Sequence, residues 1–489
     1  MRSHRFLFTL LWLLVFAVQL PAATPPTRPN IIIILTDDPG YGDLGCYGSP
    51  TIRTPNIDRM AAEGVRFTDF YSGAEVCTPS RTALLTGRYP LRSGMAGNRR
   101  VLFPNSAGGL PPAEVTLAEA LKARAYTTAH IGKWHLGIHA GSRPQDQGFD
   151  STFGLPYSND MDARAGITAK DRFSDHPPAD GWNVALQRNG EVMERPADQT
   201  TLTKRYTEEA LRVIAAANNK PFFIYLAHSM PHTPLFASPD FKGKSRRGIY
   251  GDVIEEIDWS TGEILAALRR AGLAGNTFVF FTSDNGPWLT EGAQGGSAGP
   301  LREGKGTSWE GGTRVPCIMS WPGHIPAGTK SDDYAMTIDL LPTFARLTGA
   351  TLPAKPIDGL DIWPLLSRQP GAKNPHEGYG IWYAQNELQA VVSGDGRWKL
   401  ILAHRSRTLG GRPGGRDGIP TKYENLEVGS PQLYELSRDI GETTDVAAAH
   451  PEVVKQLAAF AEKCRAELGD TLTKRTGRGN REPGRIAAP

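Results

Sequence analysis

The chain has 489 residues, of which 39% are hydrophobic and 21% are charged, and its formal net charge is +3. This length allows one large domain plus a smaller one, and the composition is typical of a soluble globular protein. A charge so close to zero argues against a nucleic-acid-binding protein. The 54 glycines and 38 prolines favour a loop-rich enzyme over a helical bundle.

The start of the chain is typical of a secretory signal peptide. Arg2, His4 and Arg5 form a basic segment, residues 6–20 are almost all apolar, and small residues follow up to Ala23. The apolar run is shorter than the ~20 residues that span a membrane, and no later run is long enough. We therefore expect export to the periplasm or the medium, with no stable insertion into a membrane.

Apolar runs alternate with helical patterns over the first two thirds of the chain. Strands are predicted at residues 30–35, 126–131, 221–227 and 277–282. Helices are predicted between them, at residues 55–63, 79–86, 116–123, 203–217 and 253–268. The first strand contains four consecutive isoleucines, which indicates burial on both faces. This order predicts an α/β fold with a mostly parallel sheet flanked by helices.

Polar side chains follow each of these predicted strands. In open parallel sheets the binding site lies beyond the carboxyl ends of the strands, so we expect these side chains to converge. In chain order they are Asp37, Asp38, Lys133, His135, His232, Asp284 and Asn285.

Cys77 precedes the helix predicted at residues 79–86. Thr78 can cap this helix, Pro79 suits its first position and Gly87 can end it. The free N–H groups and the positive dipole end of a helix favour an anion, so a sulfate, a phosphate or a developing oxyanion would be stabilised beside Cys77. For this cysteine taken alone, a purely structural role beside an ordinary helix cap stays open.

The candidate metal ligands are all oxygen donors. Asp37, Asp38, Asp284 and Asn285 suit a hard cation, Ca²⁺ before Mg²⁺, and disfavour zinc. The chain has only four cysteines, which is too few for a disulfide scaffold, and no CxxC spacing indicates zinc. They are Cys46, Cys77, Cys317 and Cys464.

The pattern changes after residue 375, where short antiparallel strands are predicted at residues 379–383, 388–392 and 398–402. A loop rich in Gly, Pro and Arg and a helix at residues 452–468 follow. We therefore divide the chain into a signal peptide, a catalytic domain, a smaller C-terminal α+β subdomain with an antiparallel sheet, and a basic flexible tail. Their predicted limits are residues 1–23, 24–375, 376–470 and 471–489.

The segment Cys77-x-Pro79-Ser80-Arg81, with Leu85-Thr86-Gly87-Arg88, resembles the signature of the formylglycine-dependent sulfatases. Further segments resemble motifs of this family, in the family order, and the resemblance covers about residues 29–470. It is similar above all to the branch of arylsulfatase A and N-acetylgalactosamine-6-sulfatase. The further segments are Asp37-Asp38, residues 132–137, 156–160, 227–232 and 283–286, and Gly304-Lys305-Gly306 with residues 310–312.

The resemblance implies an alkaline-phosphatase-like fold and a sulfatase acting on an aryl sulfate or a sulfated sugar. It also implies that a formylglycine-generating enzyme oxidises Cys77 to formylglycine, an aldehyde. One hydroxyl of the aldehyde hydrate would attack the sulfur, and the second would then expel sulfate and restore the aldehyde. With Cys77 oxidised, at most one disulfide could form among the other three cysteines.

The roles of single residues also follow from the resemblance. Asp37, Asp38, Asp284, Asn285 and the modified Cys77 would bind one Ca²⁺. Arg81 would hold the formylglycine hydroxyl, Lys133 would bridge metal-side oxygens and the nucleophile, and His135 would be the base. His232 and Lys305 would contact the sulfate and help to protonate the leaving oxygen. Ser158 would donate a hydrogen bond near the formylglycine, and His228 is expected to be only a neighbour.

Two alternatives stay open at this point. A phosphodiesterase or phosphonate monoester hydrolase of the same superfamily would share the core motif, because charge and geometry at sulfur and phosphorus are similar. A non-catalytic carbohydrate-binding relative would have no need for a modifiable Cys77.

Overall fold

The computed structural model describes residues 28–96, 101–218, 220–383 and 386–482. The predicted signal peptide, residues 1–23, lies outside these ranges. None of the helices within them combines the length and the apolar character that crossing a membrane requires.

A ten-stranded mixed sheet forms the centre of the larger part of the chain. Its strand order is β11-β2-β10-β9-β1-β8-β4-β5-β6-β7, and the five strands from β9 to β5 run parallel. The strands are β1 (Asn30–Thr36), β2 (Val65–Phe67), β4 (Thr127–Lys133), β5 (Ser151–Leu155), β6 (Leu186–Arg188), β7 (Glu191–Glu194), β8 (Phe222–Ala227), β9 (Thr277–Ser283), β10 (Cys317–Ser320) and β11 (Thr329–Ser331). The short strands β3 (Phe70–Tyr71) and β12 (Ala335–Met336) pair separately.

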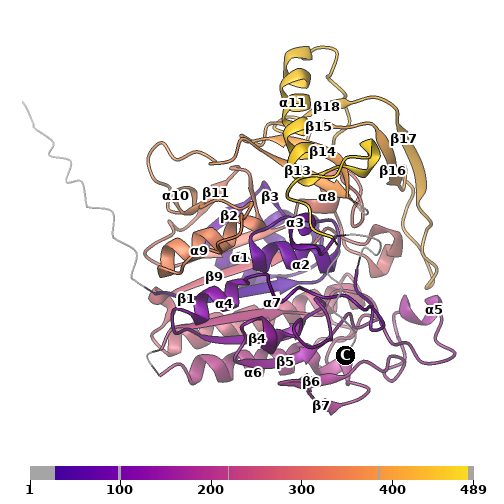
Figure 1. Cartoon of the computed structure of the whole chain (residues 1–489). Coiled ribbons are helices and arrows are strands. Elements are labelled where there is room, and N and C mark those ends of the chain that lie inside the picture. The colour runs from indigo at the N-terminus through magenta and orange to yellow at the C-terminus, as the bar shows by residue number, and fades with distance from the viewer. Residues whose placement is uncertain (1–27, 97–100, 219, 384–385, 483–489) are drawn as a thin grey trace, which may run out of the picture.

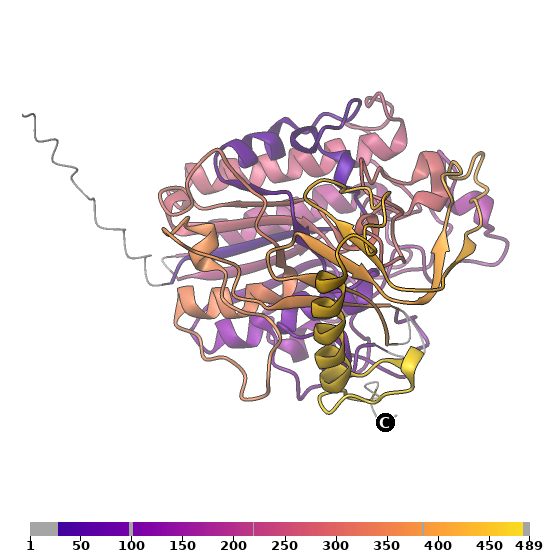
Figure 2. The same cartoon turned by 90° about the horizontal axis from the view of Figure 1, so that it is seen from above.

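Helices cover both faces of this sheet, as Figure 2 shows. β1 is buried along its whole length because Ile32 and Ile34 enter one core while Ile31 and Ile33 enter the other. The first core includes α1 (Pro55–Ala62), α6 (Leu202–Ala215) and α7 (Ile249–Arg270). The second includes α2 (Cys77–Thr86), α4 (Leu117–Lys122), α9 (Leu340–Thr348) and α10 (Trp363–Leu366). The predicted α/β fold with flanking helices is confirmed. Three further short α-helices are α3 (Pro90–Ser93), α5 (Ala169–Arg172) and α8 (Glu310–Thr313).

A four-stranded antiparallel sheet forms the C-terminal subdomain, with the order β13-β14-β15-β18. The long helix α11 (Pro451–Leu468) contributes Leu457 and Ala461 to the core that this sheet buries. The strands are β13 (Gly378–Tyr383), β14 (Glu387–Ser393), β15 (Trp398–Ile401) and β18 (Gln432–Glu435). A separate hairpin of β16 (His404–Thr408) and β17 (Glu424–Val428) extends from this subdomain toward α5 (Figure 1).

The first part of the predicted flexible tail contacts the rest of the chain. The Arg481 backbone N–H donates to the Leu91 carbonyl at 2.9 Å, and the Arg481 guanidinium donates to Glu114 at 2.6 Å. The Gly479 N–H donates to the Glu467 carbonyl at 2.7 Å. Residues 471–482 therefore have a defined place on the surface, and residues 483–489 lie outside the described ranges.

A buried charge cluster joins the C-terminal sheet to the larger part of the chain. Lys399 on β15 contacts Glu310 on α8 at 2.8 Å and Glu442 at 2.9 Å, and all three side chains are fully buried. Arg314 also contacts Glu310, at 3.1 Å. Ions buried in this way are stable only while each has an opposite charge beside it.

We predict that Lys399→Ala lowers the free energy of unfolding by about 3–5 kcal/mol, because Glu442 would stay buried without its cation. Guanidinium chloride unfolding measures this change. The control is Arg405→Ala, which removes an exposed 3.3 Å pair with Glu427 and should cost less than about 1 kcal/mol. Equal losses in the two variants would contradict the prediction.

Candidate active site

The polar side chains predicted to converge meet beyond the carboxyl ends of the central strands. Asp37 and Asp38 follow β1, Lys133 ends β4, and Asp284 and Asn285 follow β9. All of them are buried. The loops after β5 and β8, the start of α2 and the loop before α8 bring Ser158, His232, Cys77, Arg81 and Lys305 to the same place.

Three carboxylates lie together at the centre of the site. One oxygen atom of each of Asp37, Asp38 and Asp284 lies within 4.8 Å of the others. Asp38 has a φ of 73°, in the left-handed region that side chains seldom adopt, and its N–H donates to Asp284 Oδ1 at 3.2 Å. Such a conformation costs of the order of 1–3 kcal/mol and is typical of functional sites.

Each of these carboxylates has a buried cation beside it. Arg81 donates from Nε and Nη2 to Asp284 Oδ2, at 3.0 and 2.8 Å, and Lys133 Nζ lies 2.5 Å from Asp37 Oδ2. Burial alone would raise the pKa of Asp37, but Lys133 and Arg81 hold that pKa well below its ordinary value. Asp37 is therefore ionised at neutral pH.

The third cation is Lys305, whose Nζ donates to both oxygens of Asp38, at 2.6 and 2.7 Å. Despite burial, Asp38 raises the pKa of Lys305 above its ordinary value, so this side chain stays an ammonium. Its Nζ also lies 3.8 Å from Cys77 Sγ. The cation thus links the acidic centre to the candidate nucleophile.

Two buried oxygen atoms of the site have no hydrogen-bond partner in the described structure. They are Asp37 Oδ1 and Asn285 Oδ1. The amide nitrogen of Asn285 donates to Asp38 Oδ1 at 2.7 Å, which leaves the amide oxygen free. Buried polar atoms are seldom left unpaired, and oxygen atoms beside carboxylates suit a hard cation. The residues present therefore fit a metal ion bound by oxygen ligands.

Cys77 is the first residue of α2, so the helix begins two residues before Pro79, its predicted first position. The expected Thr78 cap is wrong, because the Thr78 hydroxyl donates to the His135 carbonyl at 3.0 Å and accepts the Leu102 N–H at 3.2 Å. The thiol is 2% exposed, and burial raises the pKa of Cys77 to about 12 even beside Lys305 and a second lysine. An unmodified thiol here is neutral and a poor nucleophile.

The two candidate catalytic histidines are oriented by backbone carbonyls. His135 Nε2 lies 2.8 Å from the Leu102 carbonyl, and its Nδ1 is buried without a hydrogen-bond partner among the described residues. His232 Nδ1 lies 2.7 Å from the Thr233 carbonyl, and its Nε2 lies 3.8 Å from Asp38 Oδ2. Burial lowers the pKa of both histidines, so both rings are neutral in this arrangement.

Ser158 lies in the site and His228 does not contact it. The Ser158 hydroxyl accepts a hydrogen bond from Lys133 Nζ at 3.1 Å. His228 is packed in the interior, with Ser260 3.5 Å from its Nε2, and burial lowers its pKa to about 3. It is a neutral interior residue, in line with its expected place as a neighbour.

Two further residues border the site: Trp288, which was not identified from the sequence, and Asp160, which lies in the motif at residues 156–160 but was given no role. The Trp288 ring lies 5.5 Å from the His232 ring, and Lys305 Nζ lies 4.7 Å from its centroid. Asp160 lies near His232, and its negative charge opposes part of the lowering of the His232 pKa that burial causes. Trp288 comes three positions after Asn285 in the chain. This closeness to a predicted metal ligand is the sequence feature that could have identified Trp288.

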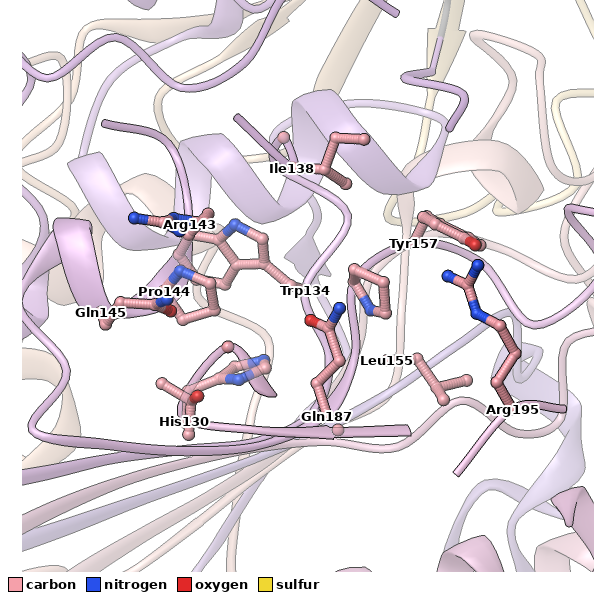
Figure 3. Close-up of a pocket in the computed structure, with 15 residues that line it drawn as sticks. His130, Trp134, Ile138, Arg143, Pro144, Gln145, Leu155, Tyr157, Gln187 and Arg195 are labelled. Carbon is pink, nitrogen blue, oxygen red and sulfur yellow. The ribbon is translucent and has the colours of Figure 1, made fainter. Parts of the chain in front are cut away.

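A separate cavity of about 240 Å³ lies against Trp134, between the loop at residues 137–145 and strands β5 and β6 (Figure 3). It is lined by Tyr157, Gln187 and Arg195 among others, and none of the predicted catalytic or metal residues lines it. Trp134 lies between Lys133 and His135 in the chain, lines this cavity, and donates from its indole nitrogen to the Ser142 carbonyl at 2.8 Å.

Comparison with known proteins identifies the family. The family model described as Sulfatase matches residues 29–350, and the model described as N-sulphoglucosamine sulphohydrolase, C-terminal, matches residues 304–406. Arylsulfatase A of Homo sapiens is 41% identical, with 94% of this chain and 92% of that protein covered. N-acetylgalactosamine-6-sulfatase of Mus musculus is 40% identical, with 88% and 84% covered.

A solved structure agrees with these relatives. The PsFucS1 sulfatase from Pseudoalteromonas sp. is 30% identical and superposes with a TM-score of 0.75, with 90% of each chain covered. The match to the family model extends over most of the chain and includes all the residues brought together at the strand ends. The chain therefore belongs to the sulfatase family and is a sulfuric ester hydrolase, as its motifs predicted.

Proposed function

We propose that the chain hydrolyses the sulfate ester of a sugar or an aryl alcohol, with a nucleophile formed by oxidation of Cys77 and with Ca²⁺ as the cofactor. The observation that carries this proposal is the state of Cys77. Its buried thiol is neutral, yet it lies 3.8 Å from the Lys305 ammonium, beside Asp37 and His232. A neutral thiol has no use for these charges, whereas an anion formed at this position would be stabilised by them.

Formylglycine at position 77 would supply a hydrated aldehyde, whose one hydroxyl attacks the sulfur and whose other hydroxyl releases sulfate. Arg81 holds Asp284 and Lys133 holds Asp37, and both cations lie near enough to Cys77 to interact with a charge there. We assign Arg81 to hold the formylglycine hydroxyl and Lys133 to bridge the metal-side oxygens and the nucleophile. His135 has an unpartnered Nδ1 and a neutral ring, so it can accept a proton. We assign it as the base.

Binding of the sulfate group is assigned to four side chains around Cys77. Lys305 and His232 flank Asp38, and Lys133 and Ser158 are hydrogen-bonded to each other. The two ammonium groups suit the negative oxygens of a sulfate. We assign Lys305 and His232 to help protonate the leaving oxygen: Lys305 is an ammonium, whereas His232 can donate from Nε2 only after its ring gains a proton, because the neutral ring carries its proton on Nδ1, toward the Thr233 carbonyl.

Asp37, Asp38, Asp284 and Asn285 would hold the Ca²⁺, with the modified Cys77 as a further ligand. The two unpartnered oxygens, Asp37 Oδ1 and Asn285 Oδ1, support this assignment. Calcium would supply positive charge that favours ionisation of the attacking hydroxyl and neutralises the sulfate oxygens.

We further propose that residues 1–23 direct export to the periplasm or the medium and that a formylglycine-generating enzyme modifies Cys77. The mature chain would consist of a catalytic domain at residues 24–375 and a smaller subdomain at residues 376–470. The four cysteines are free thiols in the structure.

We predict that mass spectrometry of the tryptic peptide 67–81, from protein made with a competent modifying enzyme, finds formylglycine at position 77. Cys77→Ala should keep the fold, by circular dichroism, and lose at least about 10³-fold in kcat/KM for 4-nitrophenyl sulfate, because no nucleophile remains. A peptide holding only the thiol, or retained activity in the variant, would refute the nucleophile. A preference of the wild type for bis(4-nitrophenyl) phosphate over the sulfate would favour a phosphodiesterase instead.

We predict that Asp284→Ala removes both the bound calcium and at least about 10²-fold of the activity, because Asp284 is a proposed ligand and also the partner of Arg81. Calcium per chain is measured by atomic emission on protein dialysed in metal-free buffer. Asp258→Ala, which changes a carboxylate that bonds the start of α1, is the control and should keep its calcium. Unchanged calcium in Asp284→Ala would show that the metal site lies elsewhere.

A further inference from the structure

An aromatic side chain borders the residues assigned to the sulfate. The Trp288 ring contacts His232 and Lys305, at 5.5 and 4.7 Å, and Trp288 is partly exposed. It also packs edge-on against Phe173, with ring centroids 6.2 Å apart. A group bonded to a sulfate held by His232 and Lys305 would therefore come to lie beside the Trp288 ring.

Two polar side chains follow Trp288 in the short helix Leu289–Gln294 and are almost fully buried. Glu291 is 4% exposed; its Oε1 accepts from the Thr290 hydroxyl at 2.9 Å, and its Oε2 has no partner among the described residues. Gln294 is 6% exposed; its Nε2 donates to Asp175, and its Oε1 is likewise unpartnered. Leaving such atoms unpaired costs stability unless a ligand pairs with them.

A second pair completes this group. Arg172 Nη1 lies 3.3 Å from Asp160 Oδ2, while Arg172 Nε and Asp160 Oδ1 are buried and unpartnered. Asp160 lies near His232, and Glu291 lies near both Lys305 and Arg172, as their mutual electrostatic effects show. The unpartnered atoms thus belong to side chains that border the residues assigned to the sulfate.

The balance of these atoms indicates the chemistry of the ligand. Within the described structure, the unpartnered atoms of this group are three acceptors and one donor: Asp160 Oδ1, Glu291 Oε2 and Gln294 Oε1, against Arg172 Nε. A ligand that pairs with them must present several O–H groups, which a sugar does and an unsubstituted aryl ring does not. The partly exposed indole ring suits the C–H face of a sugar, and a second acidic group on the ligand would be repelled by Asp160, whose pKa lies below its ordinary value.

We propose that Trp288, Glu291, Gln294, Asp160 and Arg172 form the subsite for the leaving group, and that this subsite selects the monosulfate of a neutral hexose. The inference rests on the proposed function, because it places the sulfate between His232 and Lys305. Hydroxyls of the sugar donate to the three acceptors, and the sugar ring lies against Trp288.

The C-terminal hairpin supports this subsite. The N–H groups of Gly415 and Thr421, in the loop between β16 and β17, donate to the Thr290 carbonyl at 2.8 and 3.0 Å. The Tyr423 hydroxyl donates to the Lys305 carbonyl at 3.0 Å. The hairpin therefore fixes the segment that carries Glu291 and the backbone that carries Lys305.

The test compares kcat/KM for methyl galactopyranosides and methyl glucopyranosides, each bearing one sulfate, with kcat/KM for 4-nitrophenyl sulfate. In Glu291→Gln the ratio of sugar to aryl activity should fall at least about tenfold, because a sugar hydroxyl loses its carboxyl acceptor. In Trp288→Ala it should fall by a similar factor, because the sugar ring loses the indole face. Trp288→Phe should recover part of that ratio. The matched control is Glu427→Gln, whose carboxylate is exposed on β17; its ratio should equal that of the wild type.

A wild type that hydrolyses at least one of these neutral hexose sulfates, with the expected fall in both variants, supports the subsite. Unchanged ratios in both variants, or a wild type that turns over 4-nitrophenyl sulfate but none of the sugar sulfates, would overturn it. A preference for a uronic acid sulfate over all neutral hexose sulfates would also overturn it. Failure of the proposed function would be distinct, because protein with formylglycine at position 77 would then hydrolyse no sulfate ester at all.

Discussion

The rest of the site depends on the compensation of charge between three buried carboxylates and three buried cations. Arg81, Lys133 and Lys305 each hold one of the acidic side chains, so the formal charges of the group cancel. Without this balance Asp37 could not stay ionised away from water. Even with it, burial and the neighbouring Asp37 raise the pKa of Asp284 to about 7. A bound dication would bring the group to a net charge of +2, which the single charge of a sulfate monoester and one ionised hydroxyl would offset. The arrangement thus suits a monoanionic ester.

The fold brings these charges together from segments that are far apart in the chain. Parallel strands place Asp37, Lys133 and Asp284 at one edge of the sheet, because β1, β4 and β9 all point the same way. Arg81 then crosses from α2 to Asp284 and also donates to the Lys133 carbonyl at 3.0 Å. No part of this site exists in the unfolded chain, so binding of a metal here would also stabilise the native fold.

The sequence could predict the parts of the site that follow from strand direction. Polar residues after buried apolar runs had to lie at the carboxyl edge of the sheet, which is why Asp37, Asp38 and Asp284 could be placed together. It could not predict the partner of Thr78, because a local capping pattern competes there with a tertiary hydrogen bond to His135. The sequence also could not predict that Trp288 borders the site, or that the loop between β16 and β17 contacts the segment after Trp288. Loop conformations depend on long-range contacts, such as the hydrogen bond from the Gly415 N–H to the Thr290 carbonyl.

Every residue of α2, from Cys77 to Thr86, is buried in the folded protein. A second enzyme could not reach the Cys77 side chain without unpacking this helix from the sheet and from the carbonyl of His135. If position 77 is modified as proposed, the modification must precede folding, and the order of events during biosynthesis is fixed by burial. A chain that folds too early would be trapped with a thiol, correctly folded and permanently inactive.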